Sequence, residues 1–587
     1  MRFVLAIVSF VIAALMIGYG IAQRTILAEP DEVVASLVVS TDAPVTVVDG
    51  KALNAFGGSQ SLDIGGSGSV FAAYGRTVDV LAWIGDTSYN AVTYNAETGE
   101  LASELVRGSE SEVPDPNGSD LWLDDYVKDK KLSLTVNVPE DISFIIVSDG
   151  VLPAPARISL AWPLDNSTPW SGPLIAGGAL LLLAGLGFLL WALTHTRRAR
   201  GPRRKQPKMP KLPRPPRYRS IKRSNPKAIE RATTGRRSTR RSMIAVIPMV
   251  LVGTLALGGC SAGSWPDFGA ASTPSPSPTS AEDTGSELEA PAVSVRQIER
   301  IVARISALAT EADTNRDAAL IATRFDGPAL ALRTADYVIR AADPAIAPLP
   351  AIPAGAVTLT LPQQSNSWPR TVFAVIQDDA DATIAPVALF LIQEEARSDY
   401  KVNYAMTLEP SAVLPDVAPA SVGAARLSQD IKLLAMTPSE IALAYGDILD
   451  VDTESPHFLS FEAEGDSLRL AVGLAKKNEA KAGLSSTATM SFSHAVGTGQ
   501  TIALATNDSG ALVAVSLNEI TTVAPVEAGA AVNPTGAVKA LSGIGVSIKG
   551  VQAVYGDQLL FYVPSASSGG KIILLGYSQG LIAASEI

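Results

Sequence analysis

The chain has 587 residues, of which 47% are hydrophobic and 18% are charged. We therefore expect more than one domain, and neither a wholly disordered nor a fully membrane-embedded protein. A single cysteine excludes an intramolecular disulfide, and three histidines leave few ligands for a metal. The sequence contains no C-x-x-C, H-E-x-x-H or P-loop motif, so we predict neither a metal site nor a cofactor.

The first apolar segment runs from Phe3 to Gln23 and is long enough to cross a bilayer as a helix. A cleaved signal peptide is one interpretation, with Gly20 and Ala22 as the small residues before the cleavage site. A retained anchor is the other, because the apolar run is longer than a usual signal core. We favour the anchor and predict that residues 1–23 form transmembrane helix 1 or a signal anchor.

Residues 24–170 contain short alternating apolar runs separated by Gly, Asp, Asn and Pro. This pattern predicts a sandwich-like all-β domain of antiparallel strands. TVDVLAWIG (77–85) is predicted to be one of these strands, and GGSQSLDIGGSGSV (57–70) a glycine-rich loop. The acidic run from Asp115 to Asp120 lacks the spacing of an EF-hand calcium loop, so we expect a solvated loop there.

The second apolar segment, from Pro173 to Leu193, carries no charged residue. Trp170 and Trp191 stand near its two ends, and amphipathic aromatic rings prefer the membrane–water interface. The pattern predicts transmembrane helix 2 over residues 172–194.

A basic block follows, with 19 Lys or Arg and one acid, Glu230, between Arg197 and Arg241. Lys and Arg stay on the cytoplasmic side of membrane helices. We therefore predict that residues 195–242 form a disordered cytoplasmic loop, which places 24–170 and 261–587 on the extracytoplasmic side. The loop either binds anionic lipid headgroups or is only a topology signal, and we expect no nucleic-acid partner.

The third apolar segment, from Met243 to Gly259, has 17 residues and follows the basic run RRSTRRS. It ends in Leu257, Gly258 and Gly259 directly before Cys260, and this ending resembles a bacterial lipobox. In lipoproteins, signal peptidase II cuts before such a cysteine, which then carries acyl chains. The resemblance implies a lipoprotein signal segment over 243–259 and lipid attachment at Cys260. The alternative is an ordinary transmembrane helix 3.

A Pro/Ser-rich tether, residues 260–292, precedes a region in which helical and strand patterns alternate. Apolar residues from Ile298 to Leu308 recur at helical spacing, and Asp313 is placed to cap a second helix. A capping box at 437–440 opens a second set of helices, again followed by strands.

This order predicts two α+β domains in tandem, 293–420 and 421–587. It resembles the nuclear-transport-factor-like (cystatin-like) fold, in which helices pack on a curved sheet.

The segment from Gly576 through Ser578 to Gly580 matches G-x-S-x-G and resembles the nucleophile elbow of cutinases. That resemblance implies a serine esterase with Ser578 as the nucleophile. Nine residues follow Ser578 and none is a histidine, so the rest of a triad does not follow in that family's order. We instead predict a hairpin with its turn at Ser578–Gly580, no catalytic residue, and a protein that is not an enzyme.

Together these features predict a multidomain protein with transmembrane helices, a sandwich-like all-β domain and a C-terminal α+β domain. Its Ala-rich, acidic character resembles the uncharacterised membrane proteins and lipoproteins of actinobacteria. We expect a multi-pass cell-membrane protein whose extracytoplasmic modules bind an envelope protein partner, as a scaffold in a transport or secretion complex. The alternatives are a cell-wall carbohydrate-binding protein acting through 24–170 and a serine esterase.

Overall fold

The computed structural model describes the chain except residues 1, 28–29, 165–168, 199–288, 379–380 and 382. The third apolar segment, the lipobox with Cys260, and nearly all of the basic loop and the tether lie outside the described residues. The chain divides into two compact units. One comprises residues 1–33 and 163–283, and the other comprises residues 34–162 and 284–587.

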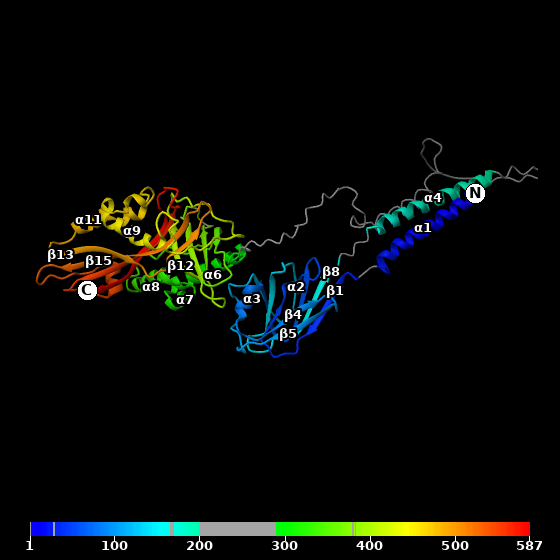
Figure 1. The fold of residues 1–587 in the computed structure, drawn as a ribbon, viewed down its shortest axis with the longest axis horizontal. Coiled ribbons are helices and arrows are strands. Elements are labelled where there is room, and N and C mark those ends of the chain that lie inside the picture. The colour runs from blue at the N-terminus through cyan, green and yellow to red at the C-terminus, as the bar shows by residue number, and fades with distance from the viewer. Residues whose placement is uncertain (1, 28–29, 165–168, 199–288, 379–380, 382) are drawn as a thin grey trace, which may run out of the picture. The chain divides into compact units, whose positions relative to one another are not determined.

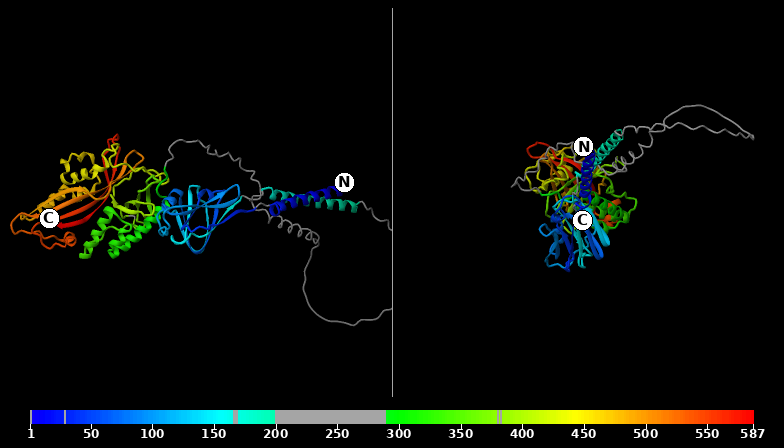
Figure 2. Two further views of the ribbon diagram at one scale, coloured as in Figure 1. Left: turned by 60° about the horizontal axis from the view of Figure 1, so that its bottom comes forward. Right: turned by 90° about the vertical axis from the view of Figure 1, so that its right-hand side faces the viewer.

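The first unit contains two long apolar helices, α1 (Arg2–Thr25) and α4 (Ser171–Arg198), which lie side by side in Figure 1 and Figure 2. Both are long and apolar enough to cross a membrane. Gly20 lies against Ser171 at the start of α4, whereas Gly185 lies against Phe10. The two helices are therefore antiparallel.

Small residues spaced seven apart form the seam between these helices. The buried positions include Ala6, Ala13 and Gly20 on α1, and Ser171, Gly178, Gly185 and Ala192 on α4. Leucines on the outer surfaces are exposed, as Leu15 and Leu180 illustrate. Lipid provides no hydrophobic driving force between helices, so close packing of small residues is what favours such a pair in a membrane.

The second unit begins with a β domain built on one eight-stranded sheet, in the order β1-β8-β3-β7-β2-β4-β5 with β6 paired to β3. The strands are β1 (Glu32–Val38), β2 (Val45–Val48), β3 (Gln60–Arg76), β4 (Tyr89–Asn95), β5 (Glu100–Val106), β6 (Asp124–Val136), β7 (Ile142–Val147) and β8 (Arg157–Pro163). The first half of β3 pairs with β8 and its second half with β7. This long strand therefore changes partner partway along its length.

The β domain differs from its sequence-based prediction in four places. Strands β2 and β4 pair in parallel, although all pairs were expected to be antiparallel. The segment 77–85 contains helix α3 (Thr77–Ile84) and not a strand, because Asp79, Val80, Trp83 and Ile84 form one buried face at helical spacing. Most of the predicted loop 57–70 lies in β3. The short helix α2 (Gly50–Leu53) was not predicted.

In the rest of the unit, three helices precede four strands, and a second group of helices precedes five more strands, with one further helix between the third and fourth of these five. The helices are α6 (Val295–Asn315), α7 (Ala318–Ala322), α8 (Gly327–Ala342), α9 (Pro438–Val451), α10 (Ser467–Val472), α11 (Leu474–Ala482) and α12 (Gly536–Ser542), with 3₁₀ turns η2 (Asp452–Glu454) and η3 (Phe458–Ser460). The strands are β9 (Val357–Pro362), β10 (Arg370–Ile376), β11 (Val387–Gln393), β12 (Lys401–Leu408), β13 (Ala488–Val496), β14 (Ile502–Ala505), β15 (Ala511–Pro525), β16 (Val551–Val563) and β17 (Ile573–Glu586). We call residues 289–587 the α+β domain.

Local capping chemistry explains several helix starts, but α9 lacks the capping box predicted at 437–440, because Thr437 accepts no hydrogen bond from the helix backbone. Ser294 and Gln297 form a capping box at α6, and Asp326 caps α8. The predicted cap at Asp313 is wrong, because α6 continues past this residue and Asp317 caps α7. Asp313 instead accepts hydrogen bonds from Tyr337 and Arg333 on α8.

A single nine-stranded sheet crosses the predicted domain boundary at residue 420, in the order β13-β15-β16-β17-β12-β11-β10-β9 with β14 paired to β15. The junction is the short antiparallel pairing of Thr407 with Tyr577 and of Leu408 with Gly576. The predicted turn at Ser578–Gly580 is wrong, because β17 runs through these residues while paired to β16.

Helices cover one face of this sheet in two clusters, with α6, α7 and α8 over the β9–β12 part and α9 and α10 over the β14–β17 part. The other face forms a third apolar cluster that includes Phe373, Phe390 and Leu560. Single bridges Gln363–Ala424 and Arg426–Leu504 link the β9 side to β14, so the sheet curls around this cluster. Figure 1 shows α9 and α11 lying along β13 and β15.

Candidate functional site

Two polar clusters are buried within the second unit. The first lies where the β domain meets the α+β domain, and we call it the arginine interface. Its five arginines come from the α+β domain and donate to α3 or to residues 110–123 of the β domain: Arg300, Arg304, Arg324, Arg370 and Arg397. Positive groups thus face carboxylate and carbonyl oxygens, which is the complementarity that fixes the register of an interface.

Asp120 is the central acceptor of the arginine interface, and its side chain is 0% exposed. Arg324 Nη2 lies 2.7 Å from Asp120 Oδ2, and the backbone N–H of Tyr400 donates to the same oxygen at 3.0 Å. Burial raises the pKa of Asp120 above its ordinary value, while the charge of Arg324 opposes this. The prediction of a solvated loop therefore fails at Asp120, although Asp115 is exposed.

A second buried ion pair joins Arg370 to Asp79 of α3, with Arg370 Nη2 2.6 Å from Asp79 Oδ1. The guanidinium of Arg370 lies 3.7 Å from the centroid of the Trp368 ring, a cation–π contact. Trp368 packs against the apolar core of the β domain, and Ala396 belongs to that core. Apolar packing and ion pairing therefore both cross the interface.

Arg397 caps the C-terminal end of α3. Its Nε donates to Trp83 O and its Nη2 to Ile84 O, both at 2.7 Å. The last carbonyls of a helix lack partners within the helix and carry partial negative charge, so a guanidinium is suited to them. A side chain of the α+β domain thereby stabilises a helix of the β domain.

The second cluster lies under α11, and we call it the Lys477 cluster. It consists of Asp450 on α9, Lys477 on α11, and, on successive strands of the sheet, His494, Glu519, Asp557 and Gln579. Lys477 Nζ lies 2.6 Å from Asp450 Oδ1 and 2.7 Å from Glu519 Oε2. His494 Nδ1 lies 2.7 Å from Asp450 Oδ2, and Gln579 Nε2 donates to Glu519 Oε1 at 2.9 Å.

Strand register explains why these groups meet. His494 is opposite Glu519, and Glu519 is opposite Tyr555. Two positions further along β16, Asp557 is opposite Gln579. Opposite residues and residues two apart share a face of a sheet, so four strands present polar groups toward the same helices.

The two acids at the ends of the Lys477 cluster have pKa shifts of opposite sign. Asp557 is fully buried, and neither of its carboxyl oxygens has a hydrogen-bond partner among the described residues. Burial, and then the charge of Glu519, raise the pKa of Asp557 well above its ordinary value. Burial also acts on Asp450, but hydrogen bonds from Lys477 and His494 outweigh it and lower the pKa. The cluster therefore favours a proton on Asp557 and a carboxylate at Asp450.

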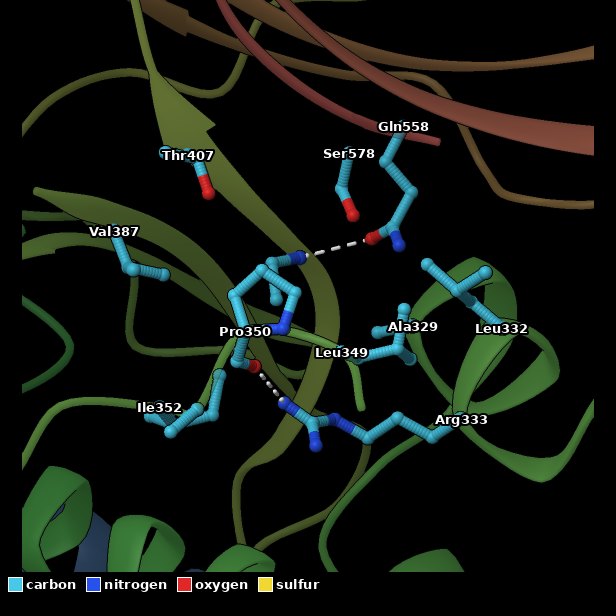
Figure 3. Close-up of a pocket in the computed structure, with 12 residues that line it drawn as sticks. Ala329, Leu332, Arg333, Leu349, Pro350, Ile352, Val387, Thr407, Gln558 and Ser578 are labelled. Atoms are coloured by element: carbon cyan, nitrogen blue, oxygen red, sulfur yellow. Dashed lines mark hydrogen bonds between the residues drawn. The ribbon is translucent and has the colours of Figure 1, made fainter. Parts of the chain in front are cut away.

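Ser578 lies in the middle of β17, opposite Gln558. It lines a cavity of about 30 Å³, and Figure 3 shows its hydroxyl beside the Gln558 amide, with Thr407 and Arg333 across the cavity. The residues that line this cavity include neither a histidine nor a carboxylate. A nucleophile elbow needs a tight turn between a strand and a helix, whereas Ser578 is in regular strand.

Packing accounts for the two glycines of the G-x-S-x-G pattern. A Cβ atom at Gly576 would lie 2.6 Å from Thr407 O, and one at Gly580 would lie 2.5 Å from Leu332 Cδ1. Glycine is therefore required at Gly576, where the neighbouring atoms belong to the backbone of β12, whereas the neighbour of Gly580 is the end of a leucine side chain.

The predicted lipid site, Cys260 with Leu257, Gly258 and Gly259, lies outside the described residues. In the part of the chain that the structure describes, no group of three or more His, Cys, Asp or Glu side chains is placed to hold a metal ion.

Sequence reasoning missed both polar clusters. Arg300 and Arg304 are four apart on α6, which signals one basic face but not its partner. Glu519 and Asp557 each interrupt an apolar strand at a position that faces helices. A lone acid in such a strand is a usable signal of a buried polar network.

These features define a protein with two membrane-length helices and a β domain docked on an α+β domain through buried ion pairs. A family model described as "Domain of unknown function (DUF8094)" matches residues 289–586, half of the chain. The chain belongs to this family. The comparisons with curated proteins and with solved structures gave no match.

Proposed function

We propose that the chain is a membrane-anchored cell-envelope protein whose extracytoplasmic domains bind an envelope protein partner, as a non-catalytic scaffold in a transport or secretion complex. The observation that carries this proposal is the arginine interface. Buried ion pairs are expensive to break, so Asp120 with Arg324 and Asp79 with Arg370 favour one composite binding body over two independent modules.

The proposed topology places 24–170 and 261–587 outside the cytoplasm. The antiparallel arrangement of α1 and α4 supports it, because such a pair puts the segment between the helices on one side of a membrane. The basic residues of 195–242 follow α4 directly and favour the cytoplasm, where they bind anionic headgroups. A third crossing or signal segment over 243–259 completes the multi-pass arrangement.

Two finer proposals concern the anchor and the fold. The chain is acylated at Cys260 after cleavage behind Gly259, as in the actinobacterial lipoproteins that it resembles. The α+β domain is a tandem of two nuclear-transport-factor-like halves, 293–420 and 421–587. The order of helices before strands in both halves supports this, as does their joining through β12 and β17.

A second candidate function is binding of cell-wall carbohydrate through the β domain. A groove of about 580 Å³ favours it, lined by the glycine-rich residues 65–69 and by residues 152–157. The strand geometry at Ser578 does not favour the remaining alternative, a serine esterase.

The test is quantitative co-purification of the tagged chain from its native host in mild detergent. Asp120→Asn should lose envelope proteins that co-purify with the wild type, because the interface loosens. Asp115→Asn, a change at an exposed acid of the same loop, should retain them. A wild-type chain that purifies alone, or an Asp120→Asn chain with unchanged partners, argues against the scaffold. Retention on purified cell wall without protein partners favours the carbohydrate-binding candidate.

A further inference from the structure

Two adjoining grooves lie on the β domain. One is the groove of about 580 Å³ beside residues 65–69, and the other, of about 390 Å³, lies over β1, β8 and β6. Val38, Gly65 and Arg157 line both. We call the two together the β-domain groove, and its lining comprises residues 36–38, 63–69, 130–131, 148 and 152–159. The inference below deepens the second candidate function, carbohydrate binding, and rests on it, whereas the scaffold proposal does not depend on it.

Strand register places two cations on either side of a position that has no side chain. Gly65 of β3 is opposite Arg157 of β8 and also opposite Lys131 of β6. Opposite residues share a face of a sheet, so the two cationic side chains stand on the same face, on strands about 10 Å apart. A Cβ atom at Gly65 would lie 3.3 Å from Arg157 Nε, so the guanidinium lies over the glycine.

A row of hydroxyl groups continues from these cations along the same face. Asp63, two residues before Gly65, is opposite Ser159 of β8 and Ser133 of β6. Ser159 Oγ lies 2.8 Å from Ser36 Oγ of β1, and Ser133 donates to Asp63. The other face of the same strands is buried: Leu62, Ile64, Leu132 and Leu160. The groove face is therefore the polar side of the sheet, and its hydroxyls suit a ligand rich in hydroxyls.

The cations gather at this groove although the domain as a whole is acidic. Residues 34–162 contain 18 Asp or Glu but only seven Lys or Arg. Three of the seven, Lys130, Lys131 and Arg157, line the groove, and Asp63 is the one acid among its lining residues.

The positive charge of the groove is not neutralised by its own side chains. Lys131 Nζ lies 3.7 Å from Asp63 Oδ2, but these side chains are 68% and 48% exposed, and such a surface pair contributes little. Lys130 and Arg157 are exposed, and neither has an ion-pair partner among the described residues. Two cations are therefore free to meet an anion that enters the groove.

We propose that the β-domain groove binds an anionic polysaccharide, a sugar chain that carries carboxylate or phosphate groups. One anionic group lies over Gly65, where the guanidinium of Arg157 and the ammonium of Lys131 both donate to its oxygens. Sugar hydroxyls exchange hydrogen bonds with Ser36 and Ser159 along the same face. Lys130 adds a third positive charge beside the chain.

Two other anionic partners suit the groove less well. Single-stranded nucleic acid stacks its bases on aromatic rings, and the residues that line the groove include no aromatic side chain. A membrane surface is nearest in sequence to Glu32 and Pro163, where the chain leads to α1 and α4. Val38 and Arg157 are at the other ends of β1 and β8, about 20 Å along these strands.

The experiment uses the full-length chain with Cys260→Ser and Ser67→Cys, so that a single cysteine carries an environment-sensitive fluorophore at the groove. The labelled chain, in phosphatidylcholine nanodiscs, is titrated with a galacturonate hexamer and with phosphorylated maltohexaose. The uncharged controls are the methyl ester of the first and plain maltohexaose. A fluorophore at the groove reports binding there and not at the basic residues 195–242, which also attract anions.

We expect a saturable change of fluorescence with the anionic oligomers, and binding that weakens as salt is added. The uncharged controls should bind at least about tenfold more weakly. Absence of binding by both anionic oligomers overturns the inference. Equal binding of the uncharged controls overturns it too, although the carbohydrate-binding candidate then stands. A response to phosphatidylglycerol nanodiscs without any sugar assigns the groove to a membrane surface and also overturns the inference.

The decisive variant combines Lys130→Gln with Arg157→Gln, which should fold normally because both side chains are exposed. It should weaken binding of the anionic oligomers at least about tenfold. The matched control combines Lys51→Gln with Arg107→Gln, which removes the same charge from exposed positions of the β domain outside the groove. This control should keep the original affinity. Equal affinities of the two double variants overturn the inference, and none of these results bears on the co-purification test of the scaffold.

Discussion

Arg324 donates to Asp120 at 2.7 Å across a sequence separation of 204 residues. The side chain of Asp120 is 0% exposed and that of Arg324 is 8% exposed, so the pair lies in protein and not in water. A surface ion pair contributes little to stability, but breaking a buried pair strands a charge where water cannot reach it. The stability of the β domain therefore depends on a residue of the α+β domain.

Asp120→Asn should destabilise the second unit by about 3 kcal/mol, the low end for breaking a buried ion pair. The low end applies because Arg324 keeps a second partner, with Nη1 2.9 Å from Asp399 Oδ2. Hydrogen exchange should accelerate at the Tyr400 amide, which donates to Asp120. Exchange equal to that of Asp115→Asn would show that the pair contributes nothing to docking.

Asp557 predicts an unusual dependence of stability on pH. Its folded pKa is raised above the unfolded value near 3.8, so the folded chain holds this proton more tightly. The contribution is fully present below the unfolded pKa and is lost as pH rises through the folded pKa, by about 1.4 kcal/mol per pH unit for one proton. Asp557→Asn should flatten this decline, as denaturant midpoints measured across the pH range will show. A wild-type profile as flat as that of the variant contradicts the prediction.

Because small residues form the contact between α1 and α4, we expect a bulky side chain at one of these positions to separate the two helices. A Cβ atom at Gly185 would lie 3.2 Å from Phe10 and Ser9, whereas one at Gly187 would meet nothing within 4 Å. In a Cys260→Ser background, a disulfide should form between Ala13→Cys and Gly178→Cys. Adding Gly185→Leu should prevent it, and adding the matched control Gly187→Leu should not. Equal cross-linking in both would refute the seam.

Gly576→Ala should destabilise the α+β domain by about 1–3 kcal/mol, the usual range for overpacking. Its new methyl group would meet the backbone of β12, with Thr407 O at 2.6 Å and Leu408 Cα at 2.9 Å. Ser578→Ala should leave stability nearly unchanged, and a fluorophosphonate probe should label neither this variant nor the wild type. Stoichiometric labelling that Ser578→Ala abolishes would make the protein a serine hydrolase.

Lipidation at Cys260 remains a prediction from the sequence. Intact-mass analysis of protein from the native host should find a chain that begins at an acylated Cys260. Globomycin or Cys260→Ala should remove that species. A single full-length, unacylated chain under all conditions would identify residues 243–259 as an ordinary helix.

Sequence patterns predicted the helices and strands whose burial follows a simple period. The apolar face of α6 from Ile298 to Ile305 is such a case, whereas β10 and β11 are buried at every position. The prediction of secondary structure failed where tertiary contacts determine which element forms. Segment 77–85 alternates well enough for a strand, but capping by Arg397 from the α+β domain stabilises it as α3.

Which residues pair within the polar clusters could not be predicted, because the partners are distant in sequence. Nothing near Asp120 indicates that Arg324 will neutralise it, so a solvated loop was the natural expectation. The G-x-S-x-G match at 576–580 had the opposite effect, because it suggested a nucleophile elbow where the structure has a regular strand. The glycines of this pattern allow close packing in a strand. The pairing of Ser578 with Gln558 of β16 depends on the folded sheet, so the local sequence does not reveal it.

The pairing of β12 with β17 has a consequence for the order of folding. β12 ends at Leu408, and its partner begins more than 160 residues later, at Ile573. Contacts between such distant segments form slowly, because a long loop has to close first. Until β17 arrives, the end of β12 at Thr407 and Leu408 presents unpaired backbone groups that other chains can pair with. The first half of the sheet is therefore prone to aggregation during synthesis. A chaperone that protects this strand edge should raise the yield of folded protein.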